Sequence, residues 1–325
     1  MTERVHGGNL TEAIARHGGV AADWLDLSTG INPAPYPVGD ISHDAWTRLP
    51  DRTALHRLLG AARNAYGIHP ANGIVAAAGA QALIQIMPRL AGSGPVRVLG
   101  PTYNEHAGCF RDAGFAVTVA GGFVSMPGGG TAVLVNPNNP DGRTHEPGDL
   151  LALARRSGLL VVDEAFCDVT PALSLCPREL PQNLVVLRSF GKFFGLAGVR
   201  LGFAVAHPAM ARRIERMLGP WAVSGPAQEI GARALSDDDW IAATRERLSA
   251  DMARLRRLLG QAGWRIAGGT DLFVTAEAGN IAERFDRLLD ARIWVRSFDY
   301  APDHLRFGLP GDESGWARLE TALTS

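Results

Sequence analysis

Apolar and polar positions follow two alternating spacings from about residue 53 to residue 206. Some segments repeat their apolar residues with the period of a helix, and these lie at 54–67, 80–91, 104–114 and 147–158. Between them lie short apolar runs at 73–79, 96–101, 115–120, 131–135, 159–166, 183–190 and 200–206. Continuous apolar strands alternating with helices are typical of a mainly parallel sheet that helices cover on both faces.

The pattern changes after about residue 208. Two long amphipathic helices are predicted at 208–218 and 237–263, followed by shorter strand candidates at 264–269, 272–277, 293–298 and 304–310. The sequence therefore predicts an α/β protein with two domains. The large cofactor-binding α/β domain is expected over 28–208, and a small α+β domain over 1–27 and 209–325.

Composition excludes several classes of partner. Net charge is −1 and charged residues make up 20% of the 325 residues, so neither nucleic acid nor another polyanion is expected as a partner. Cys109, Cys167 and Cys176 have no metal-ligand spacing, so we expect no metal site and a reducing compartment. The N-terminus has no apolar signal core and no segment is long enough to span a membrane, which predicts a soluble, cytoplasmic protein.

Lys192 is the only lysine in a chain with 32 basic residues of the Lys and Arg types. A solvated surface charge can be either residue, but a nucleophilic amine can only be lysine, because guanidinium does not deprotonate in proteins. A coding bias toward arginine is the simpler explanation of the count. The surroundings of Lys192 must therefore decide whether it is a candidate for covalent chemistry.

Polar residues follow the predicted strands of the parallel sheet at their carboxyl ends. Asn139 follows the strand at 131–135, Asp163 lies near the end of the run at 159–166, and Ser189 and Lys192 follow the apolar run from 183. Ligands of such sheets bind beyond the carboxyl ends of the strands. Each residue alone also fits a turn or a helix cap, but the set together predicts a binding site.

Three motifs carry a resemblance to a known family. They are NPNNPDG at 136–142, VVDEAF at 161–166 and SFGKFFGLAGVRLGF at 189–203. In order and spacing they resemble the signature of the class I and II aminotransferases, which are fold-type I pyridoxal-phosphate enzymes, over roughly residues 30–310. The resemblance implies that fold, with pyridoxal 5′-phosphate as cofactor.

The resemblance also implies a role for each matched residue. Lys192 would form the Schiff base with the cofactor aldehyde, and Asp163 would keep the pyridine nitrogen protonated. Asn139 would donate to the ring O3′. Tyr103 would stack on the ring, and His106 is an alternative for part of that wall. The cofactor phosphate would be bound by the side chains of Ser189 and Arg200 and by backbone N–H groups at a helix N-terminus, from Gly79, Ala80 and Gln81.

Residues outside the cofactor motifs concern the substrate. Arg306 and Asn32 match the family positions that bind a substrate α-carboxylate and close over it. The N-terminal HGGN, formed by His6, Gly7, Gly8 and Asn9, could bind a phosphate; a flexible turn is the alternative.

With LSTGINP at 27–33, that opening resembles the threonine-phosphate decarboxylases of cobalamin biosynthesis. The expected reaction is decarboxylation of L-threonine O-3-phosphate to (R)-1-aminopropan-2-yl phosphate. An aminotransferase acting on histidinol phosphate or a related amino acid, and a non-catalytic family member, are the alternatives.

Some positions depart from the usual family pattern. Phe166 and Leu49 stand where general aminotransferases have tyrosines, and Gly191 stands where many relatives have a second hydroxyl for the cofactor phosphate. These departures make ordinary transaminase activity less expected. They also leave weakened cofactor binding open. Because fold-type I enzymes usually build their sites across a two-fold axis, a homodimer is expected.

Overall fold

The computed structural model describes residues 7–123, 126 and 129–324. The chain forms two compact units. The larger unit contains residues 36–139 and 143–243, and the smaller contains 1–35, 140–142 and 244–325. The sequence analysis expected residues 209–243 in the small domain, whereas this division by contacts places them in the larger unit. The domain bounds of the sequence analysis stay a prediction.

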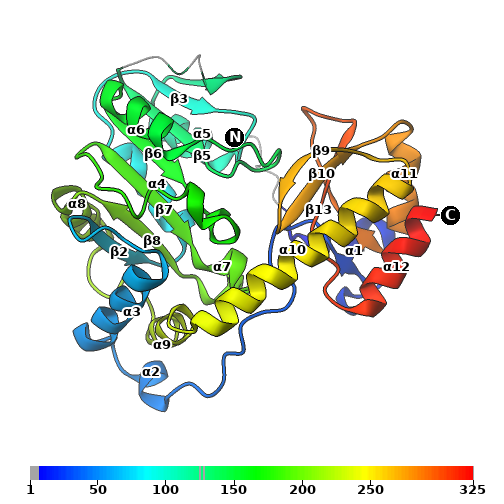
Figure 1. The fold of residues 1–325 in the computed structure, drawn as a ribbon, viewed down its shortest axis with the longest axis horizontal. Helices are drawn as coiled ribbons and strands as arrows, with labels where there is room; N and C mark the ends of the chain where they lie inside the picture. Colours follow the sequence, from blue (N-terminus) through cyan, green and yellow to red (C-terminus); the bar gives the residue numbers. More distant parts are fainter. Residues whose placement is uncertain (1–6, 124–125, 127–128, 325) are drawn as a thin grey trace. The chain divides into compact units, whose positions relative to one another are not determined.

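The larger unit is built on a seven-stranded sheet with the order β2-β8-β7-β6-β5-β3-β4 (Figure 1). The strands are β2 (Gly73–Ala77), β3 (Val96–Leu99), β4 (Val117–Ala120), β5 (Thr131–Val135), β6 (Leu159–Asp163), β7 (Leu184–Ser189) and β8 (Gly202–Ala206). Only β8 runs antiparallel to its neighbours β2 and β7. The predicted mainly parallel sheet is therefore confirmed.

Helices cover both faces of this sheet, as its continuous apolar strands require (Figure 1). One core cluster joins the strands to α4 (Ala80–Ile86), α5 (Glu105–Asp112) and α8 (Pro208–Leu218). The other helices of eight or more residues that lie wholly within this unit are α3 (Arg52–Ala65), α6 (Pro147–Arg156) and α9 (Gly225–Leu235). Strands β5 and β6 are buried at every residue, which matches their uninterrupted apolar sequences.

The smaller unit contains a four-stranded antiparallel sheet with the order β12-β13-β10-β9 and a short parallel pair, β1 with β11. The strands are β1 (Leu25–Asp26), β9 (Arg265–Thr270), β10 (Phe273–Glu277), β11 (Ile293–Trp294), β12 (Arg296–Ser297) and β13 (His304–Phe307). The single strand predicted over 293–298 is wrong in one respect. It divides at Val295, and its two halves pair in different sheets.

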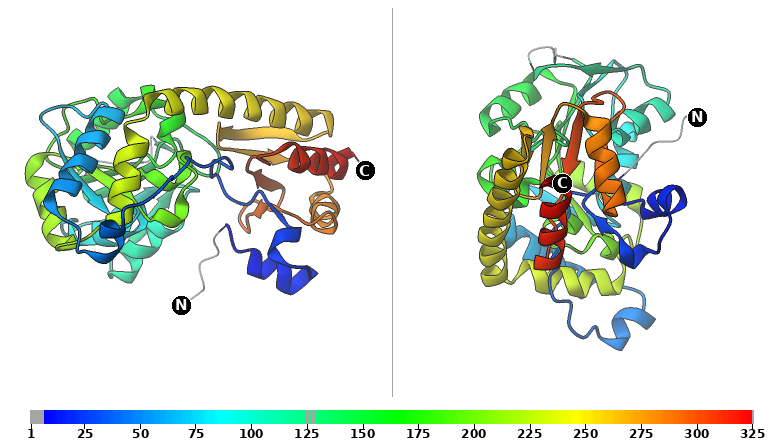
Figure 2. Two further views of the ribbon diagram at one scale, coloured as in Figure 1. Left: turned by 90° about the horizontal axis from the view of Figure 1, so that it is seen from below. Right: turned by 90° about the vertical axis from the view of Figure 1, so that its right-hand side faces the viewer.

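Four helices accompany the small sheet: α1 (Leu10–His17), α11 (Ile281–Asp290), α12 (Glu313–Thr324) and the part of α10 (Asp238–Gln261) from residue 244 onward. Helix α10 runs alongside β9 (Figure 2). Its apolar residues Leu248, Met252, Leu255 and Leu259 are buried, as the amphipathic pattern of the sequence predicts. Within the described residues, no helix has the length and apolar character needed to cross a membrane.

Candidate active site

The carboxyl ends of β5, β6 and β7 bring the predicted polar residues to one edge of the large sheet. The three strands are parallel neighbours, and their register aligns Val135 with Asp163 and Asp163 with Leu187. Ser189 is the last residue of β7, and Lys192 lies three residues later in the short helix α7 (Phe190–Phe193). Half-buried Asn139 follows β5, after a loop held by hydrogen bonds of Asn136 and Asn138.

Asp163 is buried and its two carboxylate oxygens have different partners. Oδ1 accepts from the backbone N–H of Ala165 at 2.9 Å, and Oδ2 lies 2.9 Å from Nε2 of His106. His106 is itself buried on α5. The sequence analysis considered His106 only as a wall beside Tyr103. The structure instead gives it a direct contact that fixes the orientation of Asp163.

The aromatic residue beside Lys192 is Phe166, which lacks the hydroxyl group of a tyrosine. Its Nζ lies 5.8 Å from the ring centroid of Phe166, which is buried three residues beyond Asp163. The quadrupole of an aromatic ring attracts the ammonium form of a lysine placed over its face. The departure at Phe166 therefore lies directly beside the candidate nucleophile.

Gly79 and Arg200 form a tight corner at the start of α4. Gly79 has φ +88°, and a Cβ added to it would lie 2.7 Å from Nη2 of Arg200. The Arg200 backbone is also left-handed, with φ 57°, and its Nη1 donates to the carbonyl of Ala197. Gly202 of β8 allows a second close approach, because its Cβ would lie 2.5 Å from the backbone nitrogen of Ala80. Glycine is needed at Gly79 for both space and backbone conformation.

Tyr103, Gln81 and the buried carboxylate of Glu105 form a chain of hydrogen bonds. The hydroxyl of Tyr103 donates to Oε1 of Gln81 at 3.1 Å, and Nε2 of Gln81 donates to Oε2 of Glu105 at 2.9 Å. The Tyr103 ring meets the His106 ring edge to face, with centroids 6.0 Å apart. The Gln81 side chain therefore orients Tyr103. The expectation for the cofactor phosphate concerns the backbone N–H of Gln81, which this side-chain contact does not test.

A buried ion-pair cluster behind the strand ends was not anticipated from the sequence. Arg188 of β7 donates to Oε2 of Glu164 at 3.0 Å and to Oδ1 of Asp168 at 2.9 Å. Glu164 also accepts from the Ser174 hydroxyl and the Leu175 N–H. Burial raises the pKa of Glu164. Since Glu164 follows Asp163 and Arg188 precedes Ser189, the cluster ties together two strand ends that carry candidate residues.

In the smaller unit, Arg306 lies against the N-terminal Gly-Gly segment. Arg306 is buried on β13, and its Nη2 donates to the carbonyl oxygen of Ser28 at 2.5 Å. A Cβ on Gly7 would lie 2.6 Å from that same oxygen and 3.5 Å from Nη2 of Arg306. The Gly8 N–H donates to Oγ of Ser28, which donates to Asp26. Ser28 thus connects two predicted substrate residues.

The remaining N-terminal candidates have different placements. His6 lies outside the described residues. Asn9 is exposed and precedes α1, without a side-chain capping bond to that helix. Asn32 is 2% exposed, and its Oδ1 accepts from the Ala34 N–H and from Nη2 of Arg247. Both contacts hold the side-chain oxygen of Asn32 in place.

A second arginine lies beside Arg306 and was missed from the sequence. Arg296 of β12 is the register partner of Arg306 on β13. Burial, together with the neighbouring Arg296 charge, lowers the pKa of Arg306 to about 10. Burial likewise lowers the pKa of Arg296. Both remain charged at neutral pH, so an anion bound beside them would relieve their desolvation and repulsion.

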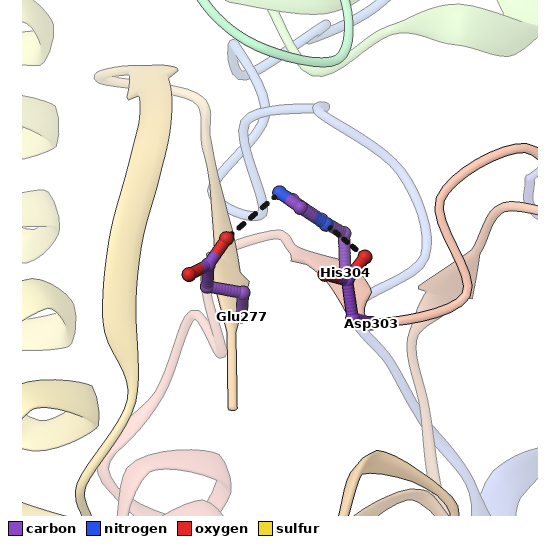
Figure 3. Close-up of side chains that lie close together, drawn as sticks. All are labelled: Glu277, Asp303 and His304. Carbon is purple, nitrogen blue, oxygen red and sulfur yellow. Dashed lines mark hydrogen bonds and ion pairs between the residues drawn. The ribbon is translucent and has the colours of Figure 1, made fainter. Parts of the chain in front are cut away.

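A group of metal-ligand residue types lies on the small sheet and is shown in Figure 3. Nε2 of His304 lies 3.2 Å from Glu277, and its Nδ1 lies 2.7 Å from Asp303. Arg265 pairs with the other oxygen of Glu277. The hydrogen bond from His304 lowers the pKa of Asp303. Both ring nitrogens and both Glu277 oxygens thus have partners, so the group is a cross-strand network of charged residues.

Comparisons with known proteins agree with the fold and with the motifs. Residues 129–322 match the family Aminotransferase class I and II. Threonine-phosphate decarboxylase of Sinorhizobium sp is 47% identical over 98% of this chain and 97% of its own length, and that of Pseudomonas aeruginosa is 46% identical over 98% and 96%.

A solved structure of similar fold is histidinol-phosphate aminotransferase from Sinorhizobium meliloti in complex with pyridoxal-5′-phosphate. It has a TM-score of 0.82 at 22% identity, covering 99% of this chain and 95% of that one. The fold-type I architecture expected from the motifs is therefore confirmed. With the family match covering more than half of its length, the chain belongs to the class I and II aminotransferase family.

Proposed function

We propose that this protein is a pyridoxal-phosphate-dependent decarboxylase of L-threonine O-3-phosphate, which forms (R)-1-aminopropan-2-yl phosphate and CO2. The observation that carries the proposal is the 46–47% identity, over nearly the full chain, to two proteins named threonine-phosphate decarboxylase. The bond from Cα to the carboxylate carbon breaks, and a proton replaces the carboxylate on Cα. Cobalamin biosynthesis is the pathway expected from the resemblance.

The side chains of the larger unit fit pyridoxal phosphate. Gly79 and Arg200 leave a corner without a side chain beside a guanidinium, which suits a phosphate. Asp163, oriented by His106, suits a protonated ring nitrogen. The cofactor would be held there by Lys192, Asp163, Asn139, Tyr103, Ser189, Arg200 and the backbone of Gly79, Ala80 and Gln81. When bound, pyridoxal phosphate supplies a conjugated ring that accepts the electrons of the broken bond.

Side chains of the larger unit would hold the cofactor and control the protons of the reaction. The Asp163 carboxylate would favour a proton on the ring nitrogen, since His106 and the Ala165 N–H hold its two oxygens in place. The Lys192 amine would hold the cofactor and would be the group that supplies the proton to Cα. Tyr103, held by Gln81, would pack on the ring face.

The residues of the smaller unit would bind the substrate. Arg306, with Arg296 beside it, suits a carboxylate, because two desolvated guanidinium groups favour an anion. Gly7 lies next to this arginine and has no side chain, which suits the close approach of a phosphate, and the Gly8 N–H holds the segment in place through its bond to Ser28 Oγ. His6 and Asn9 would complete the set, and Asn32 would donate through its amide.

The Gly79→Ala substitution is expected to weaken cofactor binding about tenfold, because a left-handed non-glycine residue with a steric conflict costs one to a few kcal/mol. The new Cβ would push the Arg200 guanidinium out of the corner. The measurement is the dissociation constant of pyridoxal phosphate by absorbance titration. Gly92→Ala is the control, since a Cβ there meets nothing within 4 Å. Equal affinities of the two variants would contradict the phosphate role of this corner.

The Gly7→Ala substitution is expected to raise KM for threonine phosphate about tenfold, since shifting a segment that makes charge-assisted hydrogen bonds costs roughly 1.5–3 kcal/mol. The methyl group would lie 2.6 Å from the Ser28 oxygen, so the segment must move away from Arg306. Cofactor affinity should not change. Gly260→Ala in the same unit, where a Cβ has open space, should leave KM unaltered.

One assay separates the proposed reaction from its alternatives. The purified holoprotein is incubated with L-threonine O-3-phosphate, and CO2 release is compared with amino transfer to 2-oxoglutarate. CO2 release without a keto acid supports the decarboxylase. Keto-acid-dependent turnover without CO2 would instead support an aminotransferase, for which relatives named histidinol-phosphate aminotransferase at 27–35% identity are the precedent. If neither CO2 nor the product of amino transfer forms, the result favours the non-catalytic alternative.

The wider biological setting is part of this proposal. A homodimer is expected because enzymes of this fold usually share residues across a two-fold axis, and Leu49 lies on the segment expected to cross it. Leu49 is 68% exposed in the single chain, so a second subunit could cover it. A cytoplasmic location, expected from the cysteine content, stays a prediction.

A further inference from the structure

Ser28 is a polar residue that is fully buried at the end of strand β1. The residue before it fixes its backbone. The Leu27 N–H donates to the carbonyl of Trp294 at 2.7 Å, and the Leu27 carbonyl accepts from the Gly308 N–H at 2.7 Å. Because Leu27 is hydrogen-bonded on both sides, the strand end that carries Ser28 is held firmly in the smaller unit.

The Ser28 hydroxyl is the middle member of a chain of hydrogen bonds. It donates to Oδ1 of Asp26 at 2.6 Å, and its oxygen accepts from the Gly8 N–H at 2.7 Å. A hydroxyl has one hydrogen, so the bond to Asp26 directs a lone pair of the oxygen to Gly8. A carboxylate acceptor also polarises the hydroxyl, which strengthens the bond that the hydroxyl itself accepts. Asp26 thus orients Ser28 toward Gly8.

We propose that Ser28, oriented by Asp26, is a positioning residue that holds the N-terminal Gly-Gly segment in place to receive the substrate phosphate. This inference rests on the proposed function, in which that segment binds the phosphate. The carbonyl oxygen of Ser28 accepts from Arg306, and a Cβ on Gly7 would lie 2.6 Å from the same oxygen. Ser28 therefore holds the segment through its hydroxyl and contacts Arg306 through its carbonyl.

Holding the segment in advance matters because glycine has the largest backbone freedom of any residue. A loose Gly-Gly segment would lose that freedom only when the substrate binds, and the loss would weaken binding. A segment already fixed by Ser28 avoids most of this loss. The Ser28 hydroxyl should therefore contribute to substrate affinity and not to the breaking of the bond at Cα.

Kinetics of variants in the chain of hydrogen bonds test this role. We expect Ser28→Ala to raise KM for L-threonine O-3-phosphate about tenfold, as loss of one charge-assisted hydrogen bond does, with little change in kcat. Asp26→Ala should also raise KM, whereas Asp26→Asn keeps an acceptor oxygen and should recover most of the affinity. The two alanine substitutions break one chain, so their effects on KM should not add. Additive effects, or a fall in kcat without a rise in KM, would overturn the inference.

Two competitive ligands separate the phosphate from the carboxylate of the substrate. O-phosphoethanolamine has the amine and the phosphate without a carboxylate, and L-2-aminobutyrate has the amine and the carboxylate without a phosphate. Ser28→Ala should raise the inhibition constant of O-phosphoethanolamine about tenfold and leave that of L-2-aminobutyrate nearly unchanged. Equal rises for both ligands would show that Ser28 acts through Arg306 or through the fold, which overturns the inference.

Ser314→Ala is the matched control. The Ser314 hydroxyl also donates to the aspartate two residues earlier, Asp312, at 2.8 Å, and it lies in the same unit at the start of α12. This variant should leave KM and both inhibition constants unaltered, and an equal rise in KM would overturn the inference. Kinetics are compared at a temperature at which thermal unfolding shows the variants to be folded. If Ser28→Ala does not fold, Asp26→Ala and Asp26→Asn provide the same test.

A readout without substrate distinguishes this inference from the proposed function. Hydrogen–deuterium exchange of the N-terminal peptide is followed by mass spectrometry in the holoprotein. Ser28→Ala should speed deuterium uptake by this peptide, because the Gly8 N–H loses its acceptor, and Ser314→Ala should not. Unchanged uptake in Ser28→Ala overturns the positioning role. A holoprotein that shows the faster uptake in Ser28→Ala but releases no CO2 overturns the function alone.

Discussion

Replacing Lys192 by alanine is expected to reduce CO2 release from threonine phosphate by at least about 10³-fold, since both covalent attachment and proton return to Cα are lost. No other lysine exists in the chain that could take over. The methyl group would leave the Phe166 ring without the amine that faces it. The measurement is single-turnover CO2 release, with visible absorbance of the bound cofactor as a second signal.

Lys192→Arg is the matched variant for this experiment. It keeps a positive charge above Phe166 but cannot act as a nucleophile, so it should be as inactive as Lys192→Ala. Borohydride reduction of the unmodified holoprotein should label the peptide 189–200 and neither variant. If that peptide stays unlabelled, or if Lys192→Arg retains activity, Lys192 does not carry the chemistry.

Replacing Asp163 by asparagine should have the second largest effect. Removing one member of a buried charged pair costs about 3–5 kcal/mol, which corresponds to a loss of kcat on the order of 10²–10⁴-fold. The amide retains the size of the carboxylate and its place between His106 and the Ala165 N–H. It lacks the negative charge that would hold a proton on the ring nitrogen. Steady-state kcat and the dissociation constant of pyridoxal phosphate are both measured.

Asp168→Asn is the comparison for this variant. Asp168 is also a buried carboxylate of the larger unit, but it pairs with Arg188 behind the strand ends. We expect Asp168→Asn to lower the unfolding temperature while the folded fraction keeps its kcat. Equal losses of kcat in both variants would show that Asp163 acts through the fold rather than on the cofactor.

The large sheet could be predicted because its strands are defined by local sequence. Runs such as LLVV before Asp163 are apolar on both faces, and helices with clear periodicity separate them. The strand at 293–298 was harder to predict. Its division at Val295 depends on two partners, Leu25–Asp26 and Leu305–Arg306, which no local pattern in 293–298 specifies.

In the candidate site, too, features set by local sequence could be predicted and contacts between distant residues could not. Asp163, Ser189 and Lys192 were found because the ends of parallel strands meet at one edge, which topology alone requires. The contacts of His106 with Asp163 and of Arg247 with Asn32 join residues 57 and 215 positions apart. Such pairs have no signature in one sequence, since His106 and Arg247 lie on helices that look like any other amphipathic helix. The place of Arg296 opposite Arg306 depends on the pairing of β12 with β13, which the sequence of 293–298 does not specify.

The close approach at Gly191 constrains how this turn could change in evolution. A Cβ at Gly191 would lie 2.7 Å from Cα of Ala197, a main-chain atom that cannot swing aside as a side chain does. Replacing Gly191 by serine or threonine is therefore not a one-step change. The backbone near Ala197 must first open, so the order of the two changes decides whether the intermediate protein survives selection.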